Sequence, residues 1–92
     1  MIRSFRHAGI EKFFLTGSKA GIQPKHAGKL SIQLFALNRA KSEKDLSVLG
    51  WELHPLKGES AGRWSIKVNG NWRLTFVFEE EDVILLDYED YH

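Results

Sequence analysis

The last five residues of the chain, 88–92, carry two phenols, two carboxylates and an imidazole. An imidazole exchanges protons near neutral pH, and a neighbouring phenol or carboxylate can orient it or relay the proton. Most small domains end in a dispensable tail, so this composition makes Asp90, Tyr91 and His92 candidates for proton transfer. The same residues could instead close a strand and cover the edge of the core, and spacing alone does not decide between these roles.

A second group of ionisable side chains lies earlier in the chain. His54 and Lys57 precede the first predicted long strand, and Arg73 alternates with apolar residues of the next strand. Arg63 and Lys67 should project on the same face as Arg73, because alternate residues of a strand share one face. Guanidinium and ammonium groups bind phosphate, so we expect a cationic surface there. An ordinary solvated face is the alternative interpretation.

Together these residues supply what a metal-independent ribonuclease needs. Such an enzyme removes a proton from a 2′-hydroxyl, stabilises charge on phosphate and protonates the leaving 5′-oxygen. His54 and His92 suit the proton transfers, and Lys57 and Arg73 suit the phosphate. The ring of Tyr91 could stack on an unpaired base or join the proton relay. The histidines and the carboxylate show no short metal-ligand spacing, so we expect neither a metal nor another cofactor.

Composition limits the kinds of protein this can be. The 92 residues include no cysteine, which excludes disulfides, a thiol nucleophile and cysteine-type zinc sites and suits a reducing cytoplasm. The formal net charge is +1, but acids gather at 79–82 and near the C-terminus, which leaves residues 1–78 clearly basic. A nucleic-acid partner therefore remains open. We expect one domain spanning 1–92, with no signal peptide or membrane span.

Apolar spacing predicts two helices in the first half of the chain. The first runs from Ile10 to a stop at Gly17. The second begins at Pro24 and ends near Ala40, and Gly28 inside it suggests a site of close helix packing. The apolar stripes of the two helices contain Ile10, Phe13, Phe14, Ala27, Leu30, Leu34 and Leu37.

The second half changes to the alternation of strands. Residues 63–68 and 72–78 predict a hairpin, with Asn69-Gly70 supplying the turn. A further turn at 80–82 leads to residues 83–88, which are apolar at successive positions and predict a central strand covered on both faces.

The remaining segments complete an α+β domain. Residues 1–5 could form a short strand, and residues 41–50 form a polar connection. The elements predict two N-terminal helices packed on one face of a small, mostly antiparallel sheet. The other face of the sheet carries the polar residues.

Three motifs in combination are similar to one known family. They are Leu-His-Pro-Leu-Lys-Gly at 53–58, Asn-Trp-Arg at 71–73 and the terminal Asp-Tyr-His at 90–92. Together with residues 1–7 and 64–66, they make the whole chain resemble the HigB family of RelE-type bacterial toxins. The resemblance implies a RelE-like fold and an endoribonuclease that cuts messenger RNA in the ribosomal A site. The implied chemistry is attack of the 2′-hydroxyl on the adjacent phosphate, without a metal.

The resemblance also implies residue roles and partners. Lys57 and Arg73 would contact or stabilise the phosphate, and which imidazole is the acid and which the base stays open. The implied partners are a HigA-like helix-turn-helix antitoxin, the 70S ribosome and messenger RNA, with operator DNA reached only through the antitoxin and no membrane. The implied catalytic positions are His54, Asp90, Tyr91 and His92.

Two other functions remain open on the same fold. A ParE-like toxin would poison DNA gyrase, although His54 and the terminal Asp-Tyr-His set argue against it. A non-catalytic module would hold RNA or a protein on its basic face. RelE-type toxins are often strongly basic, whereas this chain carries only +1, so we expect the acidic turn at 79–82 to lie away from the RNA-facing surface.

Overall fold

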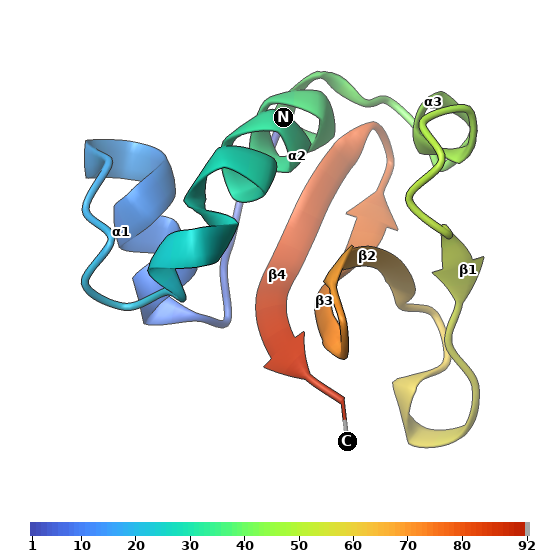
Figure 1. Ribbon diagram of the computed structural model, residues 1–92. Helices are drawn as coiled ribbons and strands as arrows, with labels where there is room; N and C mark the ends of the chain where they lie inside the picture. The colour runs from blue at the N-terminus through green and yellow to red at the C-terminus, as the bar shows by residue number, and fades with distance from the viewer. Residues whose placement is uncertain (92) are drawn as a thin grey trace.

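Helices cover one face of a four-stranded antiparallel sheet (Figure 1). This computed structural model describes residues 1–91. The strands, in sheet order, are β1 (His54–Pro55), β2 (Trp64–Asn69), β3 (Trp72–Glu79) and β4 (Asp82–Asp90). The helical elements are α1 (Ala8–Thr16), η1 (Pro24–His26), α2 (Ala27–Arg39), α3 (Lys44–Ser47) and η2 (Gly58–Ser60). The expected α+β architecture is confirmed.

Local signals explain where the two long helices begin and end. The Nδ1 atom of His7 accepts a hydrogen bond of 3.0 Å from the backbone N–H of Ile10, which caps the start of α1. Gly17 ends that helix in the left-handed region, with φ 79°. Pro24 occupies the first position of η1, which leads directly into α2. Both predicted helices are therefore confirmed.

Two backbone segments approach each other closely at Gly9 and Gly21, and not at Gly28, where we expected it. A Cβ atom at Gly28 would meet nothing within 4 Å, so the expectation of close helix packing there is wrong. A Cβ atom at Gly9 would instead stand 2.3 Å from the carbonyl oxygen of Gly21. The contact between α1 and the following loop is what requires glycine, because it brings two backbones together without room for a side chain.

Two segments differ from the sequence prediction. The connection at 41–50 contains the short helix α3, because Leu46 is buried in the core. The N-terminal residues form no strand. They attach to the outer edge of β4 by two isolated parallel bridges, Ile2 to Val83 and Phe5 to Leu86.

An extra residue in β4 decides which side chains reach each face of the sheet. Leu85 has φ 53° and lies where the pairing of β3 with β4 shifts register. Val83 and Leu86 are therefore both buried against the core, and after Leu86 the odd-numbered residues point to the other face. Leu85 itself is 36% exposed, so the expectation of a strand covered on both faces is wrong.

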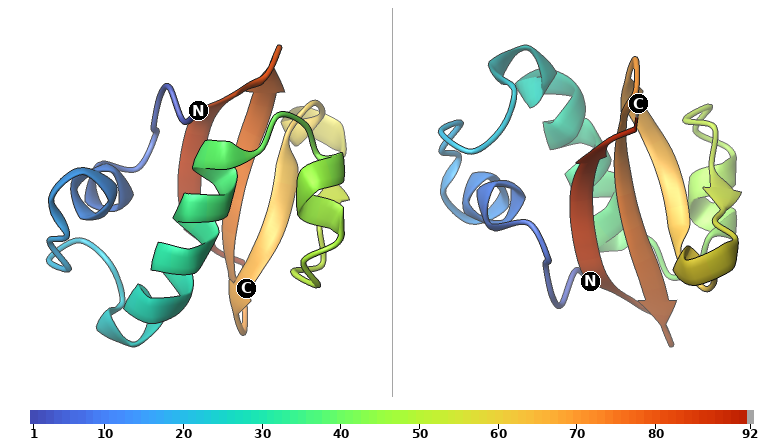
Figure 2. Two further views of the ribbon diagram at one scale, coloured as in Figure 1. Left: turned by 90° about the horizontal axis from the view of Figure 1, so that it is seen from above. Right: turned by 90° about the horizontal axis from the view of Figure 1, so that it is seen from below.

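Figure 2 shows α2 lying across one face of the sheet, and the buried side chains of the core lie between the helices and this face. We call the face of the sheet turned away from α1 and α2 the open face. The largest fully buried apolar side chains between the layers are Ile10, Leu30, Leu34, Leu37, Ile66, Leu74, Phe76, Val83 and Leu86.

Candidate functional site

A hydrogen-bond network joins three strands on the open face. Arg63, which directly precedes β2, is only 7% exposed. Its Nη2 atom donates to the hydroxyl of Thr75 and to the carbonyl of Leu85, at 2.8 Å each. The Thr75 hydroxyl in turn donates to the carboxylate of Glu89. A buried cation is thus linked through one hydroxyl to a carboxylate near the end of β4.

Burial governs the ionisation of Arg63. It lowers the pKa of the guanidinium, and the positive charge of Arg6 lowers it further. The charges of Glu89 and Asp87 and the phenol of Tyr91 act in the opposite direction. Because an arginine remains charged at neutral pH even after such a shift, the open face has a permanent positive charge beneath its surface.

Tyr91 lies beside this network at the end of β4. Its backbone N–H donates to the carbonyl of Asn71 at 2.9 Å, which ties the C-terminal end to the hairpin between β2 and β3. Its side chain is 39% exposed. Burial raises the pKa of the phenol, the charge of Glu89 raises it further, and the cations Arg63 and Arg73 lower it. The phenol therefore keeps its proton at neutral pH.

Arg73 lies on the same face, in register with Lys67 on one side and Glu89 on the other. Its Nη1 atom donates to the carbonyls of Gly70 at 2.8 Å and Trp72 at 3.1 Å. These bonds hold the half-buried guanidinium at the hairpin, where its other donors remain available. Lys67 and Arg73 share this face, as predicted, together with the acidic Glu89, whereas Arg63, which we also expected to project from it, is buried.

His54 stands at the edge of the sheet on the exposed strand β1, in register with Ser65. Its Nδ1 atom lies 2.9 Å from the carbonyl oxygen of Glu52, and since a carbonyl only accepts, Nδ1 carries the proton. The neutral ring therefore has its lone pair on Nε2, which is the form a general base needs. The Nζ atom of Lys67 lies 3.4 Å from the carboxylate of the same Glu52. Lys57 is exposed and follows β1 closely.

The terminal residues divide between the two faces of the sheet. Asp90 pairs with Trp72, so it lies on the face that packs against the helices, opposite to that of Tyr91. His92 lies outside the described residues. The structure thus brings Tyr91 together with Arg73 and the buried Arg63, and it places Asp90 on the reverse side of the same strand end.

The residues that sequence reasoning missed in this site are Thr75, Asp87, Glu89 and Arg6. Their charges and hydroxyl complete the network. Alternation along 87–91 was a readable signal, since Asp87, Glu89 and Tyr91 are separated by one residue each. It was hidden because the bulge at Leu85 reverses the faces in the middle of the strand.

The acidic turn is far from this end of the sheet. Glu79 pairs with Asp82 at one end of the β3–β4 hairpin, and Trp72 pairs with Asp90 at the other. The carboxylate of Asp82 lies 3.0 Å from Arg3 and 3.4 Å from the N-terminal amine. Asp82 therefore pairs with the positive charges of the N-terminal segment, at the end of the hairpin opposite to Tyr91.

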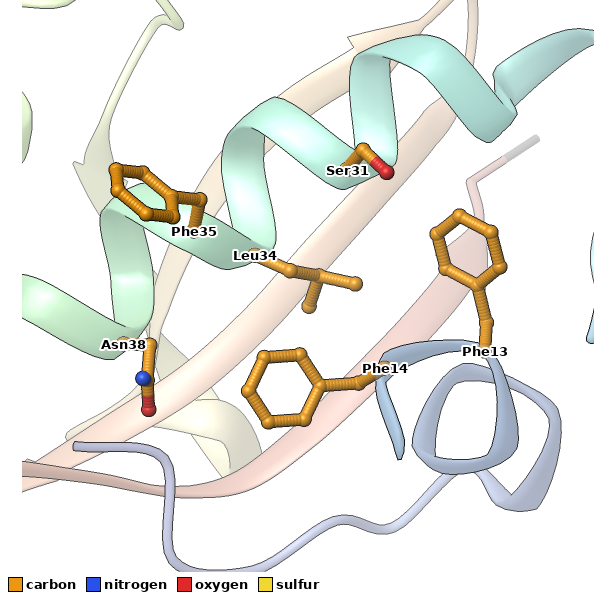
Figure 3. A pocket seen from close by; sticks show the side chains of 6 residues that line it. All are labelled: Phe13, Phe14, Ser31, Leu34, Phe35 and Asn38. Atoms are coloured by element: carbon orange, nitrogen blue, oxygen red, sulfur yellow. The ribbon is translucent and has the colours of Figure 1, made fainter. Parts of the chain in front are cut away.

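Within residues 1–91, a cavity of about 230 Å³, lined by both apolar and polar side chains, opens on the helical layer (Figure 3). It lies between α1 and α2 and has no ionisable side chain in its lining of Phe13, Phe14, Ser31, Leu34, Phe35 and Asn38. Proton transfer cannot take place there, so the open face is the candidate reaction site. In the part of the chain that the structure describes, no three histidine, cysteine or acidic side chains are grouped to hold a metal ion.

Comparison with known proteins finds one family and one relative that match the chain over nearly its whole length. A family described as "RelE-like toxin of type II toxin-antitoxin system HigB" matches residues 3–92. The chain is 40% identical to a protein of Proteus vulgaris named "Endoribonuclease HigB", over 92 residues and the full length of both chains. Among the described residues, no helix is long and apolar enough to span a membrane.

Proposed function

Because this chain belongs to the HigB-like family of RelE-like toxins and is a type II toxin with endoribonuclease activity, we propose that it cleaves messenger RNA in the A site of the ribosome. The observation that carries the proposal is the joint position of Arg73 and Tyr91 on the open face, above the buried cation Arg63. This face offers positive charge and a protonated phenol to an RNA backbone.

The proposed reaction requires two proton transfers and no further reactant. The 2′-oxygen attacks the adjacent phosphorus while its proton passes to a base, and the bond to the 5′-oxygen breaks as that oxygen takes a proton from an acid. The products are a 2′,3′-cyclic phosphate and a 5′-hydroxyl. With Nδ1 donating to the carbonyl of Glu52, Nε2 is the nitrogen of His54 that can accept the proton. His92, Asp90 and Tyr91 complete the proposed catalytic set, in which the two imidazoles divide the roles of acid and base.

The phosphate needs cations that can reach it. Arg73 keeps donors beyond those that bind the hairpin carbonyls, and Lys57 is exposed two residues after the end of β1. Lys67 extends the cationic face towards the ribosome. Arg63 contributes its charge from beneath the surface and through Thr75, since its burial excludes extended contact with RNA.

The proposed partners follow from this function. They are a HigA-like helix-turn-helix antitoxin that neutralises the toxin, the 70S ribosome and its messenger RNA. Operator DNA is contacted only through the antitoxin, and the site of action is the cytoplasm. The proposed reaction uses no metal ion.

A purified reaction tests the proposal. Wild type is incubated with 70S ribosomes programmed with a defined messenger RNA, with and without EDTA, and the new RNA ends are analysed. We expect one cut in the A-site codon, a 5′-hydroxyl and a cyclic phosphate, all unaffected by EDTA. His54→Asn keeps an amide nitrogen where Nδ1 donates to Glu52 but removes Nε2, so we expect cleavage to fall at least about 100-fold. Wild-type cleavage by folded His54→Asn contradicts the assignment of His54, and cleavage of free RNA alone contradicts action on the ribosome.

A further inference from the structure

A buried pair of polar aromatic residues lies behind the end of β4, on the side of the helices. The Nδ1 atom of His26 and the hydroxyl of Tyr88 are 2.5 Å apart, and both side chains are buried, with His26 only 2% exposed. The Tyr88 hydroxyl also accepts a weaker hydrogen bond, at 3.4 Å, from the backbone N–H of Gln23. One tyrosine thus joins the last strand to the segment that begins α2.

Both partners of this hydrogen bond are neutral at physiological pH. Burial lowers the pKa of His26, and the charge of Lys25 lowers it further. Burial raises the pKa of the Tyr88 phenol, although the backbone hydrogen bond from Gln23 acts against this shift. Because Tyr88 already accepts from Gln23, its own proton can be donated to Nδ1 of His26.

The position of Tyr88 connects this pair to the proposed catalytic residues. Its ring stacks on Trp72, with centroids 4.5 Å apart, and Trp72 is the β3 partner of Asp90. Tyr88 is also the last buried residue before Asp90 and Tyr91. The N-terminal segment bridges the outer edge of β4 at Val83 and Leu86, so among residues 1–91 the end of β4 is paired only with β3.

We propose that the hydrogen bond between His26 and Tyr88 positions the C-terminal end of β4 for cleavage, with both acting as positioning residues and neither touching RNA. The reason is geometric: Tyr88 fixes the strand from the helical layer two residues before Asp90, where, among residues 1–91, no strand pairs with the outer edge of β4. Small displacements of reacting groups cost large factors in rate. This inference rests on the proposed function, because it requires that Asp90 and Tyr91 act in catalysis.

The test measures single-turnover cleavage of messenger RNA on programmed 70S ribosomes, at saturating toxin, together with the affinity of the toxin for those ribosomes. Tyr88→Phe removes only the hydroxyl and keeps the ring on Trp72. His26→Leu removes the other partner, and His26→Asn keeps a polar atom near the position of Nδ1. Leu46→Val changes a buried core residue of α3, so it is the control for loss of stability without loss of this hydrogen bond. Circular dichroism and thermal unfolding establish that each variant is folded at the assay temperature.

We expect Tyr88→Phe and His26→Leu to cleave about ten-fold more slowly with unchanged ribosome affinity, and His26→Asn to recover most of the rate. The double variant should be no slower than the slower single variant, because both remove the same bond. Leu46→Val should cleave at the wild-type rate. If folded Tyr88→Phe also cleaves at the wild-type rate, the proposal is wrong, and this variant decides the matter even if His26→Leu does not fold.

Asp90→Asn, measured in parallel, separates this inference from the proposed function. Loss of cleavage by Asp90→Asn with normal cleavage by Tyr88→Phe overturns only the positioning role. Normal cleavage by Asp90→Asn shows instead that the assignment of Asp90 is wrong. A slow rate in every variant that tracks its melting temperature, Leu46→Val included, indicates a purely structural effect and overturns the inference.

Discussion

The guanidinium of Arg63 donates a hydrogen bond of 2.8 Å to the hydroxyl of Thr75, and both residues are buried on the face of the sheet that carries the candidate site. The hydroxyl passes the interaction on to Glu89. Positive charge on this face therefore comes from two residues at different depths. Lys67 is partly exposed at the surface, and Arg63 is buried beneath it. The hydrogen bonds of Arg63 and Thr75 link the start of β2 to β3 and β4 beneath the proposed RNA contact.

Arg63→Met should destabilise the fold. The substitution removes the donor to the buried hydroxyl of Thr75 and to the carbonyl of Leu85, and a buried polar group left without its charged donor costs about 1–3 kcal/mol. Urea denaturation measures the change in the free energy of unfolding. Lys67→Met, which changes a partly exposed cation on the same face, is the matched control. Its free energy of unfolding should stay within about 0.5 kcal/mol of the wild-type value. Equal free energies of unfolding for Arg63→Met and Lys67→Met would show that the hydrogen bonds of Arg63 do not stabilise the fold.

Tyr91→Phe should slow cleavage by a factor of about 10² or more while keeping the stacking ring. The pKa of the Tyr91 phenol is raised above its ordinary value near 10, so its proton stays in place throughout the range from pH 6 to 9. The ratio of wild-type to Tyr91→Phe rates should therefore be constant over that range. A ratio that falls towards one as the pH approaches 9 would contradict a protonated phenol in the reaction.

The free energy of unfolding should decrease as the pH is lowered, because of His26. Its folded-state pKa is lowered, so below pH 6.5 the unfolded chain binds a proton that the folded chain does not. This contribution is complete above pH 6.5 and is lost as the pH falls through the folded pKa, by at most about 1.4 kcal/mol per pH unit. Urea unfolding at pH 7 and pH 5 should show a smaller fall for His26→Leu than for wild type. His54 is exposed, so the His54→Leu variant should lose as much unfolding free energy between pH 7 and pH 5 as wild type loses through His26. A loss in His26→Leu equal to that of wild type contradicts this prediction.

Two glycine substitutions should have opposite effects. Gly28→Ala places a methyl group in open space within α2 and should stabilise the protein by about 0.5–1 kcal/mol. Gly9→Ala forces a methyl group against the carbonyl of Gly21 and should destabilise it by about 1–3 kcal/mol. Thermal unfolding of the two variants beside wild type measures both. A stabilising Gly9→Ala would mean that the contact between α1 and the loop at Gly21 is not as close as described, and a destabilising Gly28→Ala would contradict open space around Gly28.

The main elements of the fold could be predicted from local patterns. Helical spacing and a terminal glycine define α1, and the Asn69-Gly70 turn defines the β2–β3 hairpin. The failures come from long-range contacts. The helix α3 depends on burial of one side chain, Leu46, and the N-terminal residues pair with a strand 81 positions away. Neither contact leaves a periodic signal in the sequence.

The candidate site was only partly visible for a related reason. Tyr91, Arg73 and Lys67 could be placed because residue type and alternation agree on the polar face. The burial of Arg63 could not be foreseen, since it depends on a hydroxyl from β3 and a carbonyl at the bulge of β4. Strand alternation places Asp90 and Tyr91 on opposite faces, although the sequence presents them as adjacent members of one catalytic set, and the bulge decides which face each of them reaches.

Mapping of RNA 5′-ends in cells that lack the antitoxin tests the central claim most directly. Wild type, His54→Asn and His92→Gln are each induced briefly, and new 5′-ends are compared with the reading frames of translated messages. The account predicts cuts within translated codons, in frame, in cells expressing wild type and in neither variant. Growth arrest by wild type without such cuts would contradict it and would point to gyrase poisoning or to binding without cleavage.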